Sequence, residues 1–219
     1  ISFDVPYPAN YGGVIDVFYK LKALSAQGVE IHLHCFEYGR GNQKELEQLC
    51  CSVTYYHRKT GPKSLLSGIP YIVKSRENTT LKINLLSNNY PILFEGLHCC
   101  HLLGDLDFTD RIKLVRTHNV EHEYYGQLAA NEKSPFKKQF FKSEAKKLRN
   151  FERILKKADY LLTISEADQL YFEENYKKPK VRYVPAFHSA SKVNTKVGKG
   201  DYALYHGNLS VAENAQGAA

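Results

Sequence analysis

Methionine and tryptophan are absent from the 219 residues, and no apolar run comes near the length of a membrane span. Crossing a bilayer as a helix takes about 20 consecutive apolar residues, so we expect no membrane-spanning helix in these residues. The pattern of a secretory signal, an apolar stretch before a small-residue cleavage site, is also missing. The segment Ile1 to Asp4 reads like the end of a strand, and we interpret the chain as a piece of a longer protein.

The sequence also lacks the evenly numbered, spaced cysteines that form a disulfide framework. The five cysteines are odd in number and include two adjacent pairs: Cys35, Cys50, Cys51, Cys99 and Cys100. Such a set is a poor framework for disulfides in a chain of this length. Buried free thiols are the better interpretation, and they are typical of the reducing cytosol. We therefore expect a cytoplasmic protein, either free or peripheral at the inner face of the membrane.

Positive charge is in excess, with 30 Lys and Arg against 23 Asp and Glu and a net charge of +7. Nucleic acid, an anionic membrane surface or an anionic small substrate would each suit a chain of this charge. The charge alone does not choose among these three partners.

Short apolar segments rich in β-formers alternate along the chain with longer amphipathic ones. The predicted strands are Val29 to Phe36, Ser52 to His57, Pro91 to Phe94, Lys113 to Arg116, Tyr160 to Ile164 and Val181 to Val184. The predicted helices are Gly13 to Gln27, Gln43 to Leu49, Lys63 to Asn88 in pieces, Glu121 to Ala130, Pro135 to Lys157 and Glu166 to Tyr176. This alternation predicts an α/β fold, a Rossmann-like parallel sheet with helices on both faces.

The composition changes after Pro185. Residues 189–200 are small, polar and typical of an interdomain linker. A strand is predicted again at Tyr202 to His206, followed by Gly207 and Asn208. We therefore predict an amino-terminal domain at 1–188, a linker at 189–200 and the truncated start of a second α/β domain at 201–219.

A glycine pair follows the first strand-like segment. The sequence DVPYPANYGG ends at Gly12 and Gly13, directly before a predicted helix. Glycines let the backbone approach a ligand closely, and a helix amino terminus favours an anion such as phosphate. Neither the G-x-G-x-x-G fingerprint nor a P-loop is present. A tight turn without a ligand is an equally good interpretation of the residues alone.

The second candidate segment is KLVRTHNVEH, which starts at Lys113. Here His118 follows a predicted strand, at the edge of the sheet where ligands of open α/β folds bind. Asn119 is expected to cap the next helix, and a histidine bonded only to the loop backbone is the alternative. His118 and His122 cannot share a metal, because only one of them should lie in the helix.

Further along the same edge, Glu95 ends another predicted strand, where a carboxylate would bind sugar hydroxyls or cap a helix. The following His98-Cys99-Cys100-His101 run is disfavoured as a metal site, because adjacent residues of a helix point apart. We predict no metal site.

The predicted helix from Pro135 is strongly cationic. One stripe is expected to face the core: Phe136, Phe140, Leu148, Phe151 and Leu155. Basic residues cover much of the rest, among them Lys137, Lys138 and Lys142. These three are either a solvated face or a contact for anionic lipid headgroups. Nucleic acid is disfavoured, because no recognition module accompanies the charge.

Five segments resemble a known family when they are taken in order. They are PYPANYGGVIDVFYKLKALSAQGVEIHLHCF, RTHNVEHEYYGQLA, ADYLLTISEADQLYF, VRYVPAFH and YALYHGNLSVAEN. Together they resemble the amino-terminal half of GT-B-fold glycosyltransferases, in particular the large retaining family usually numbered four. The resemblance covers nearly the whole chain.

The resemblance implies roles by position. Gly12 and Gly13 match the glycine loop under the donor diphosphate, and His118 matches a histidine that contacts the transferred sugar. Ser165 and Glu166 match a strand-end pair near the cleft, where Asn119 and Glu95 are also expected. Gly207 and Asn208 match the first phosphate-side turn of the donor domain, and the family's E-x7-E pair is not among these residues.

The resemblance also implies an activity, the retaining transfer of a hexose such as mannose from a sugar nucleotide to a glycan or lipid-linked saccharide. It implies no cofactor, since the sugar nucleotide is a substrate, and acceptor binding falls mainly on this domain. The isolated fragment is expected to be inactive. Two alternatives stay open: a non-catalytic nucleotide- or sugar-binding module, and a membrane-associated protein that uses the basic helix.

Overall fold

The computed structural model describes residues 1–193, 198–202, 204, 205 and 217. The chain divides into two units, Ile1–His188 and Ser189–Ala219, and all the elements below belong to the first. The predicted start of a second domain falls mostly outside the described residues, and Gly207 and Asn208 lie there too.

All strand pairs that the structure describes are parallel, which confirms the predicted α/β class. The strands are β1 (His32–Glu37), β2 (Ser52–His57), β3 (Ile92–Glu95), β4 (Lys113–Thr117), β5 (Tyr160–Thr163) and β6 (Lys180–Tyr183). Strand β1 pairs with β2, and β3, β4, β5 and β6 pair in that order. Each strand is short and buries at least one apolar or aromatic side chain.

The amino-terminal segment joins the two groups of strands. Ser2 pairs with Cys35 of β1, and its amide donates to the His34 carbonyl at 2.8 Å. On its other side, the Glu95 amide of β3 donates to the Ile1 carbonyl at 2.9 Å. The spatial order is therefore β2, β1, residues 1–4, β3, β4, β5, β6. The chain order reverses at residues 1–4, which are thus the topological switch point of a Rossmann-like sheet.

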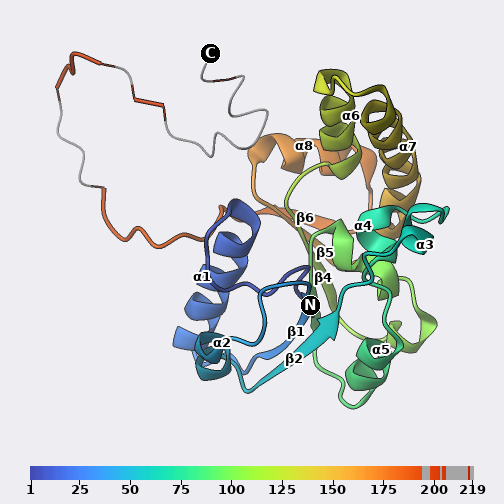
Figure 1. Cartoon of the computed structure of the whole chain (residues 1–219). Coiled ribbons are helices and arrows are strands. Elements are labelled where there is room, and N and C mark those ends of the chain that lie inside the picture. The colour runs from blue at the N-terminus through green and yellow to red at the C-terminus, as the bar shows by residue number, and fades with distance from the viewer. Residues whose placement is uncertain (194–197, 203, 206–216, 218–219) are drawn as a thin grey trace. The chain divides into compact units, whose positions relative to one another are not determined.

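Helices flank these strands (Figure 1). The α-helices are α1 (Gly12–Ala26), α2 (Lys44–Leu49), α3 (Pro62–Leu65), α4 (Tyr71–Lys74), α5 (Thr79–Leu86), α6 (Glu121–Asn131), α7 (Pro135–Phe151) and α8 (Glu166–Asn175). Three 3-10 helices complete the list: η1 (Leu97–Leu102), η2 (Leu106–Phe108) and η3 (Glu152–Lys157). Helices α6 and α7 lie side by side, and in this view the strands lie between that pair and α1.

Three sequence predictions about these elements need correction. Strand β1 begins at His32, because Val29 and Glu30 are exposed and precede the pairing with β2. The single helix predicted from Pro135 is α7 followed by η3. Phe136 was expected in the core but is 90% exposed. It lies about 120° around the helix from buried Leu148, as 3.6 residues per turn require.

One ion pair ties the first helix to the middle of the sheet. Arg116 of β4 is fully buried, and its Nε and Nη2 donate to the two Asp16 carboxylate oxygens of α1 at 3.0 and 2.8 Å. The guanidinium also donates to the carbonyls of Val184 (2.5 Å) and Pro185 (3.1 Å), after β6. Two-pronged pairing of this kind has fixed geometry, so α1, β4 and the end of β6 are held in one arrangement.

Replacing Arg116 by methionine should destabilise the domain by about 3–5 kcal/mol, because the Asp16 carboxylate would stay buried without its main partner. Urea unfolding of wild type and Arg116→Met measures this loss. Arg149→Met is the matched control, since Arg149 is exposed on α7, and its change should stay within about 0.5 kcal/mol. Equal effects of the two substitutions would contradict the assigned role of Arg116.

Candidate functional site

The candidate site lies at the carboxyl edge of the sheet, beside the switch point. Gly96 follows β3 and His118 follows β4, and these two strands are neighbours. Helix α1 begins at the same edge, after the loop that leaves residues 1–4. Ligands of open α/β sheets bind outside the carboxyl ends of the strands, where the strand order reverses. The fold therefore brings two of the predicted segments, the glycine pair and the His118 segment, to one edge.

A chain of buried ion pairs runs behind this edge. Lys20 of α1 donates to Asp16 at 3.0 Å and to Glu95 at 2.9 Å. Glu95 then lies 3.5 Å from Nε2 of His118. With Arg116 on the far side of Asp16, these five residues form what we call the ion-pair chain. Asp16, Lys20, Glu95 and Arg116 are buried, and the His118 side chain is 11% exposed.

The ion-pair chain keeps both carboxyl groups ionised. Burial by itself raises the pKa of Glu95, but the Lys20 ammonium and His118 outweigh it and hold the pKa at about 2. Burial likewise acts to raise the pKa of Asp16, while the bonds from Arg116 and the charge of Lys20 bring it well below its usual value. Paired cations are what make buried carboxylates tolerable.

Asp16, Glu95 and His118 could offer three metal ligands, since their donor atoms lie within 4.8 Å of one another. The Lys20 ammonium already contacts both carboxylates. A metal ion would have to displace this buried cation or accept its repulsion at short range. The Lys20 ammonium thus already neutralises these carboxylates, and the three residues do not fit a bound metal.

His118 has one ring nitrogen that Glu95 does not engage. Its Nε2 faces the ionised Glu95 carboxylate, and an ionised carboxylate only accepts hydrogen bonds. Nε2 therefore carries a proton, and in the neutral ring Nδ1 is left with its lone pair. Phe3 packs edge-on against the imidazole with ring centroids 5.5 Å apart. Glu95 and Phe3 together orient the ring, and Nδ1 can accept a hydrogen bond from a hydroxyl.

The two glycines at the start of α1 have different surroundings. A Cβ on Gly13 would lie 2.7 Å from the Phe3 ring, whereas a Cβ on Gly12 would meet nothing within 4 Å. The residue before the helix, Tyr11, makes no side-chain cap to the α1 amides. Gly13 thus lets Phe3 pack between α1 and His118, and the first amides of α1 are not used by a cap.

The loop before these glycines is held in place by Arg40, which follows β1. Arg40 contacts the Asp4 carboxylate at 3.3 Å and donates to the Pro8 carbonyl at 2.7 Å. Tyr11 donates its hydroxyl to Asp4 at 2.6 Å, and burial followed by this contact raises the pKa of Tyr11 well above its usual range. The path from the switch point to α1 is therefore fixed by side chains.

Three other predicted site residues lie at or just before the start of a helix. Ser165 caps α8 by accepting from the Asp168 amide at 3.0 Å, and Glu166 is exposed in the first turn of that helix. The prediction that Asn119 caps α6 is wrong. Val120 occupies the cap position, and Asn119 is exposed one residue earlier. All three follow β4 or β5, so they lie at the same sheet edge as His118.

The sequence analysis missed Asp16, Lys20 and Arg116. A signal was present, because Asp16 and Lys20 are four residues apart among apolar positions of α1 that are all buried: Val14, Val17, Phe18 and Leu21. Charged residues on the apolar face of a helix indicate buried partners. The partners themselves, 75 and 100 residues away, could not be named from the sequence.

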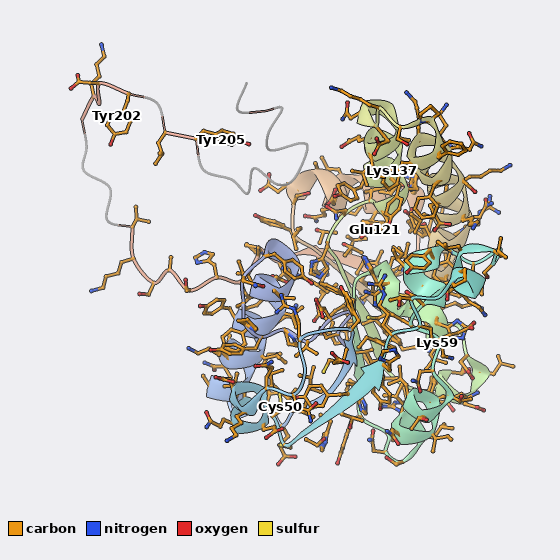
Figure 2. All side chains as sticks on the ribbon, viewed as in Figure 1. Cys50, Lys59, Glu121, Lys137, Tyr202 and Tyr205 are labelled. Carbon is orange, nitrogen blue, oxygen red and sulfur yellow. The ribbon has the colours of Figure 1, made fainter. Side chains whose placement is uncertain are left out.

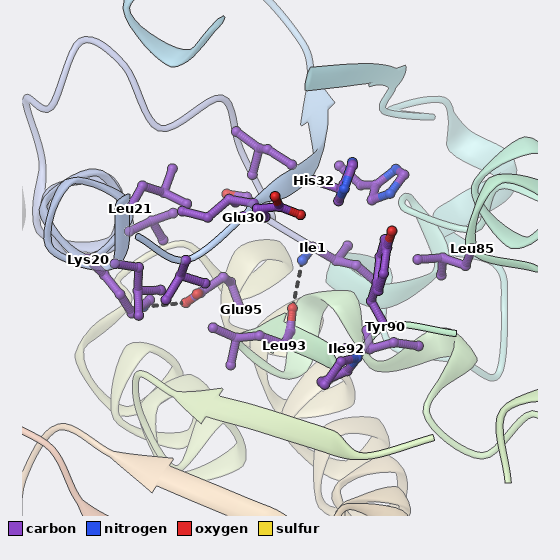
Figure 3. Close-up of a pocket in the computed structure, with 18 of the residues that line it drawn as sticks. Ile1, Lys20, Leu21, Glu30, His32, Leu85, Tyr90, Ile92, Leu93 and Glu95 are labelled. Atoms are coloured by element: carbon purple, nitrogen blue, oxygen red, sulfur yellow. Dashed lines mark hydrogen bonds and ion pairs between the residues drawn. The ribbon is translucent and has the colours of Figure 1, made fainter. Parts of the chain in front are cut away.

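A cavity of about 190 Å³ lies behind the ion-pair chain, where β1 and β3 begin (Figure 3). Lys20 and Leu21 of α1 line it together with Glu95 of β3, and the Ile1 amino group donates to the Leu93 carbonyl at 2.6 Å. The first residues of β1 and β3 also line the cavity, and Glu95 lies between it and His118.

A second buried pair lies next to the edge. His98 Nδ1 of η1 and Glu121 Oε1 of α6 are 3.9 Å apart, and among the described residues neither atom has a hydrogen-bond partner. Burial raises the pKa of Glu121 to about 7 and lowers that of His98 well below its usual value. His98 is therefore neutral near pH 7, and Glu121 becomes neutral as the pH falls below about 7, unlike the ionised carboxylates of the ion-pair chain.

The substitution Glu121→Gln should remove the loss of folding stability that ionisation of Glu121 causes as the pH rises. Because the pKa of Glu121 is higher in the folded chain, its contribution is complete below about pH 4.5 and falls as the pH rises through about 7. Relative to wild type, Glu121→Gln should thus be more stable at about pH 8 than at about pH 5, by up to about 3 kcal/mol. His98 is unchanged in both proteins and cancels.

Urea unfolding at the two pH values measures this difference. Glu123→Gln is the control, because Glu123 is exposed on the same helix. A pH-independent difference between Glu121→Gln and wild type would contradict the assigned state of Glu121.

The part of the chain that the structure describes contains no helix long and apolar enough to span a membrane.

No family model matches the sequence. The chain is similar to a protein of Klebsiella pneumoniae described as an uncharacterized 44.6 kDa protein in the cps region, with 31% identity over 230 aligned positions. The similarity covers 99% of this chain and 57% of that protein. The chain thus spans a little over half the length of this relative.

Proposed function

We propose that this chain is the acceptor-side domain of a glycosyltransferase that uses a sugar nucleotide and works in the synthesis of a surface polysaccharide. The observation that carries the proposal is the position of His118. Its Nε2 is backed by ionised Glu95, its Nδ1 is not engaged by Glu95, and it lies at the same sheet edge as the uncapped start of α1. This arrangement suits a substrate that has hydroxyl groups beside phosphates.

The relative supports the same class of function. Its name places it in a cps region, and such regions encode proteins for capsular polysaccharide. Sugar transfer is the central chemistry of that synthesis. The resemblance of the five sequence segments to GT-B glycosyltransferases agrees with this, and it adds the retaining stereochemistry and the hexosyl donor to the proposal.

The chemistry to be supported is the transfer of a glycosyl group. The bond between the anomeric carbon and the diphosphate oxygen breaks, its electron pair leaves with the diphosphate, and an acceptor hydroxyl oxygen bonds to the carbon while its proton departs. Positive charge develops on the sugar and negative charge on the leaving group. Amides at the start of α1 would stabilise the leaving diphosphate, since donors fixed in advance are effective there.

In this scheme His118 is a positioning residue. Its Nδ1 accepts a hydrogen bond from a hydroxyl of the transferred sugar, and Glu95 keeps the ring in the orientation and tautomer that leave Nδ1 free. Lys20 keeps Glu95 ionised. In this scheme the ion-pair chain transfers no proton to or from substrate. It fixes the one ring that meets substrate.

The full-length protein, given a panel of radiolabelled sugar nucleotides and a membrane extract as acceptor, should transfer one sugar. Donor hydrolysis without acceptor is the second readout. The enzyme proposal is lost if no sugar nucleotide is consumed in either assay, whereas donor binding without turnover would favour a non-catalytic sugar-binding module.

His118→Ala should lower kcat/KM for the donor by about 10- to 100-fold, the value of one hydrogen bond to a substrate hydroxyl in a desolvated site. The matched control is His57→Ala, because the His57 side chain is 80% exposed and only approaches Glu37, at 4.0 Å. Normal turnover by His118→Ala would remove the assigned role of His118 and leave the enzyme proposal standing.

A second function, contact with an anionic membrane surface, is favoured by the surface of α7. This helix carries six basic residues and one acidic residue, Glu144, which is buried. Phe136 at its start is 90% exposed, and Leu66 in the loop that meets α7 through Lys147 is 89% exposed. Exposed apolar side chains among lysines suit the headgroup region of a bilayer. Figure 2 shows Lys137 in the α6–α7 pair.

The three lysines of the sequence prediction do not share one side of α7. Lys137 and Lys142 are exposed and Lys138 is half-buried, and five residues place Lys142 about 140° around the helix from Lys137. A flat membrane surface would therefore contact Lys138 and Lys142 along one side of α7. It would contact Lys137 at the end of the helix.

Binding to vesicles that contain anionic lipid should weaken at least tenfold when Lys137, Lys138 and Lys142 are all changed to Glu, since each cation near such a surface contributes about 1 kcal/mol. Cosedimentation measures the bound fraction, with Lys44→Glu of exposed α2 as the control. Equal binding to neutral vesicles, or no effect of the triple change, would exclude this surface.

A further inference from the structure

Arg58, the first residue after β2, is held in one position by three neighbours. Its Nε donates to the Ser75 hydroxyl at 3.0 Å. Its guanidinium carbon lies 4.5 Å from the Tyr38 ring centroid and 5.5 Å from the Tyr71 ring centroid. Stacking on aromatic rings occupies the faces of a guanidinium and leaves its edges available. The terminal nitrogens Nη1 and Nη2 are thus oriented without being used.

Arg58 has no acidic partner. No carboxylate of the described residues lies within 4.0 Å of it, although Arg40 and Arg116 each have one. The terminal nitrogens of Arg58 also make no hydrogen bond within the described part of the chain. A half-buried cation that is fixed and uncompensated attracts an anion from solution.

A second arginine adds to this positive charge. Arg76 is buried and donates to two carbonyls, those of Phe3 at 2.8 Å and Ile72 at 2.6 Å, and to no carboxylate among the described residues. Burial lowers the pKa of Arg76, and the positive charge of Arg58 lowers it further. A bound anion would offset both charges.

These arginines lie at the functional edge. Arg58 follows β2 directly, and Arg76 binds the carbonyl of Phe3, whose ring contacts His118. The two arginines also act on the buried pair of His98 and Glu121. Both arginine charges lower the pKa of His98, and that of Arg76 lowers the pKa of Glu121. The β1–β2 side of the edge is therefore cationic, beyond Phe3 from the ion-pair chain.

We propose that Arg58, supported by Arg76, binds a phosphoryl group of the acceptor substrate. The assignment of the phosphoryl group to the acceptor rests on the proposed glycosyl transfer. The anion site itself rests on the geometry of Arg58 alone. A planar guanidinium with both terminal nitrogens free matches the oxygens of a phosphoryl group. A saccharide linked to a lipid through phosphate carries such a group next to its sugar.

The first experiment measures anion binding without turnover. Inorganic phosphate is titrated into the full-length protein by calorimetry, with wild type, Arg58→Gln and Lys59→Gln compared. Lys59 is the matched control, because it is the next residue, is exposed and loses the same charge. The dissociation constant should rise about tenfold in Arg58→Gln and less than twofold in Lys59→Gln, as expected when one charged hydrogen-bonding group is lost. Equal changes in the two variants would overturn the proposal.

A second measurement uses only wild-type protein, in case Arg58→Gln does not fold. Phenylglyoxal modifies arginines, and mass spectrometry follows each site. Phosphate should slow modification of Arg58 at least fivefold and leave exposed Arg149 unaffected. Equal rates with and without phosphate at Arg58 would refute the site.

The source of the phosphoryl group is decided by kinetics. Arg58→Gln should raise KM for a lipid-linked acceptor about tenfold and leave KM for the donor unchanged, and the opposite pattern would assign the group to the donor and overturn the proposal as stated. Protection of Arg58 by phosphate in a protein without transferase activity would keep the anion site and remove the proposed function. Transfer that is indifferent to Arg58→Gln would keep the function and remove the site.

Discussion

The Lys20 ammonium lies between two buried carboxylates, and these carboxylates contact Arg116 and His118. Asp16 on one side holds Arg116, and Glu95 on the other faces His118. A buried charge without its partner costs several kcal/mol, so none of these residues is stable there alone. As a set they join α1 to β3 and β4. Phe187 closes the set after β6 by donating its amide to Asp16 at 2.9 Å. The edge is therefore ordered before any ligand binds, as an electrostatic site needs to be.

The fold could be predicted from the sequence because its signals are local. The strands are short segments that contain apolar or aromatic residues, and Ser52–His57 was predicted with the bounds that the structure has. The placement of His118 needed only the rule that ligands meet the carboxyl ends of parallel strands. Phe136 shows where this local reasoning fails. Its spacing from Phe140 is helical, but the buried side of α7 is set by Leu148 and Glu144, which pack elsewhere around the helix.

The site could be predicted only in part, because its energetics depend on distant residues. Gly12, Gly13 and His118 were predicted from their segments and Glu95 from its place at a strand end, but the residues that orient His118 were not. In the sequence Asp16 and Lys20 are an ordinary pair one turn apart, and Glu95 is a strand end. Only the fold shows that Lys20 joins them, across 75 residues. Arg58 is a similar case, since its value as an anion site depends on Tyr38, Tyr71 and Ser75 from three separate segments.

Phe3 links the two halves of the edge, and its position argues that they act on one substrate pair. Its ring fills the space that a Cβ at Gly13 would need and meets His118 edge-on. The same ring lies 5.2 Å from His98, and its carbonyl accepts from Arg76. Anion-seeking groups therefore occur on both sides of one aromatic residue, the start of α1 on one side and Arg58 with Arg76 on the other. A transfer reaction between two phosphorylated substrates requires two separate places for their charges, since the phosphates repel each other. In the proposed reaction His118, which contacts the same ring, would bind the sugar between those phosphates.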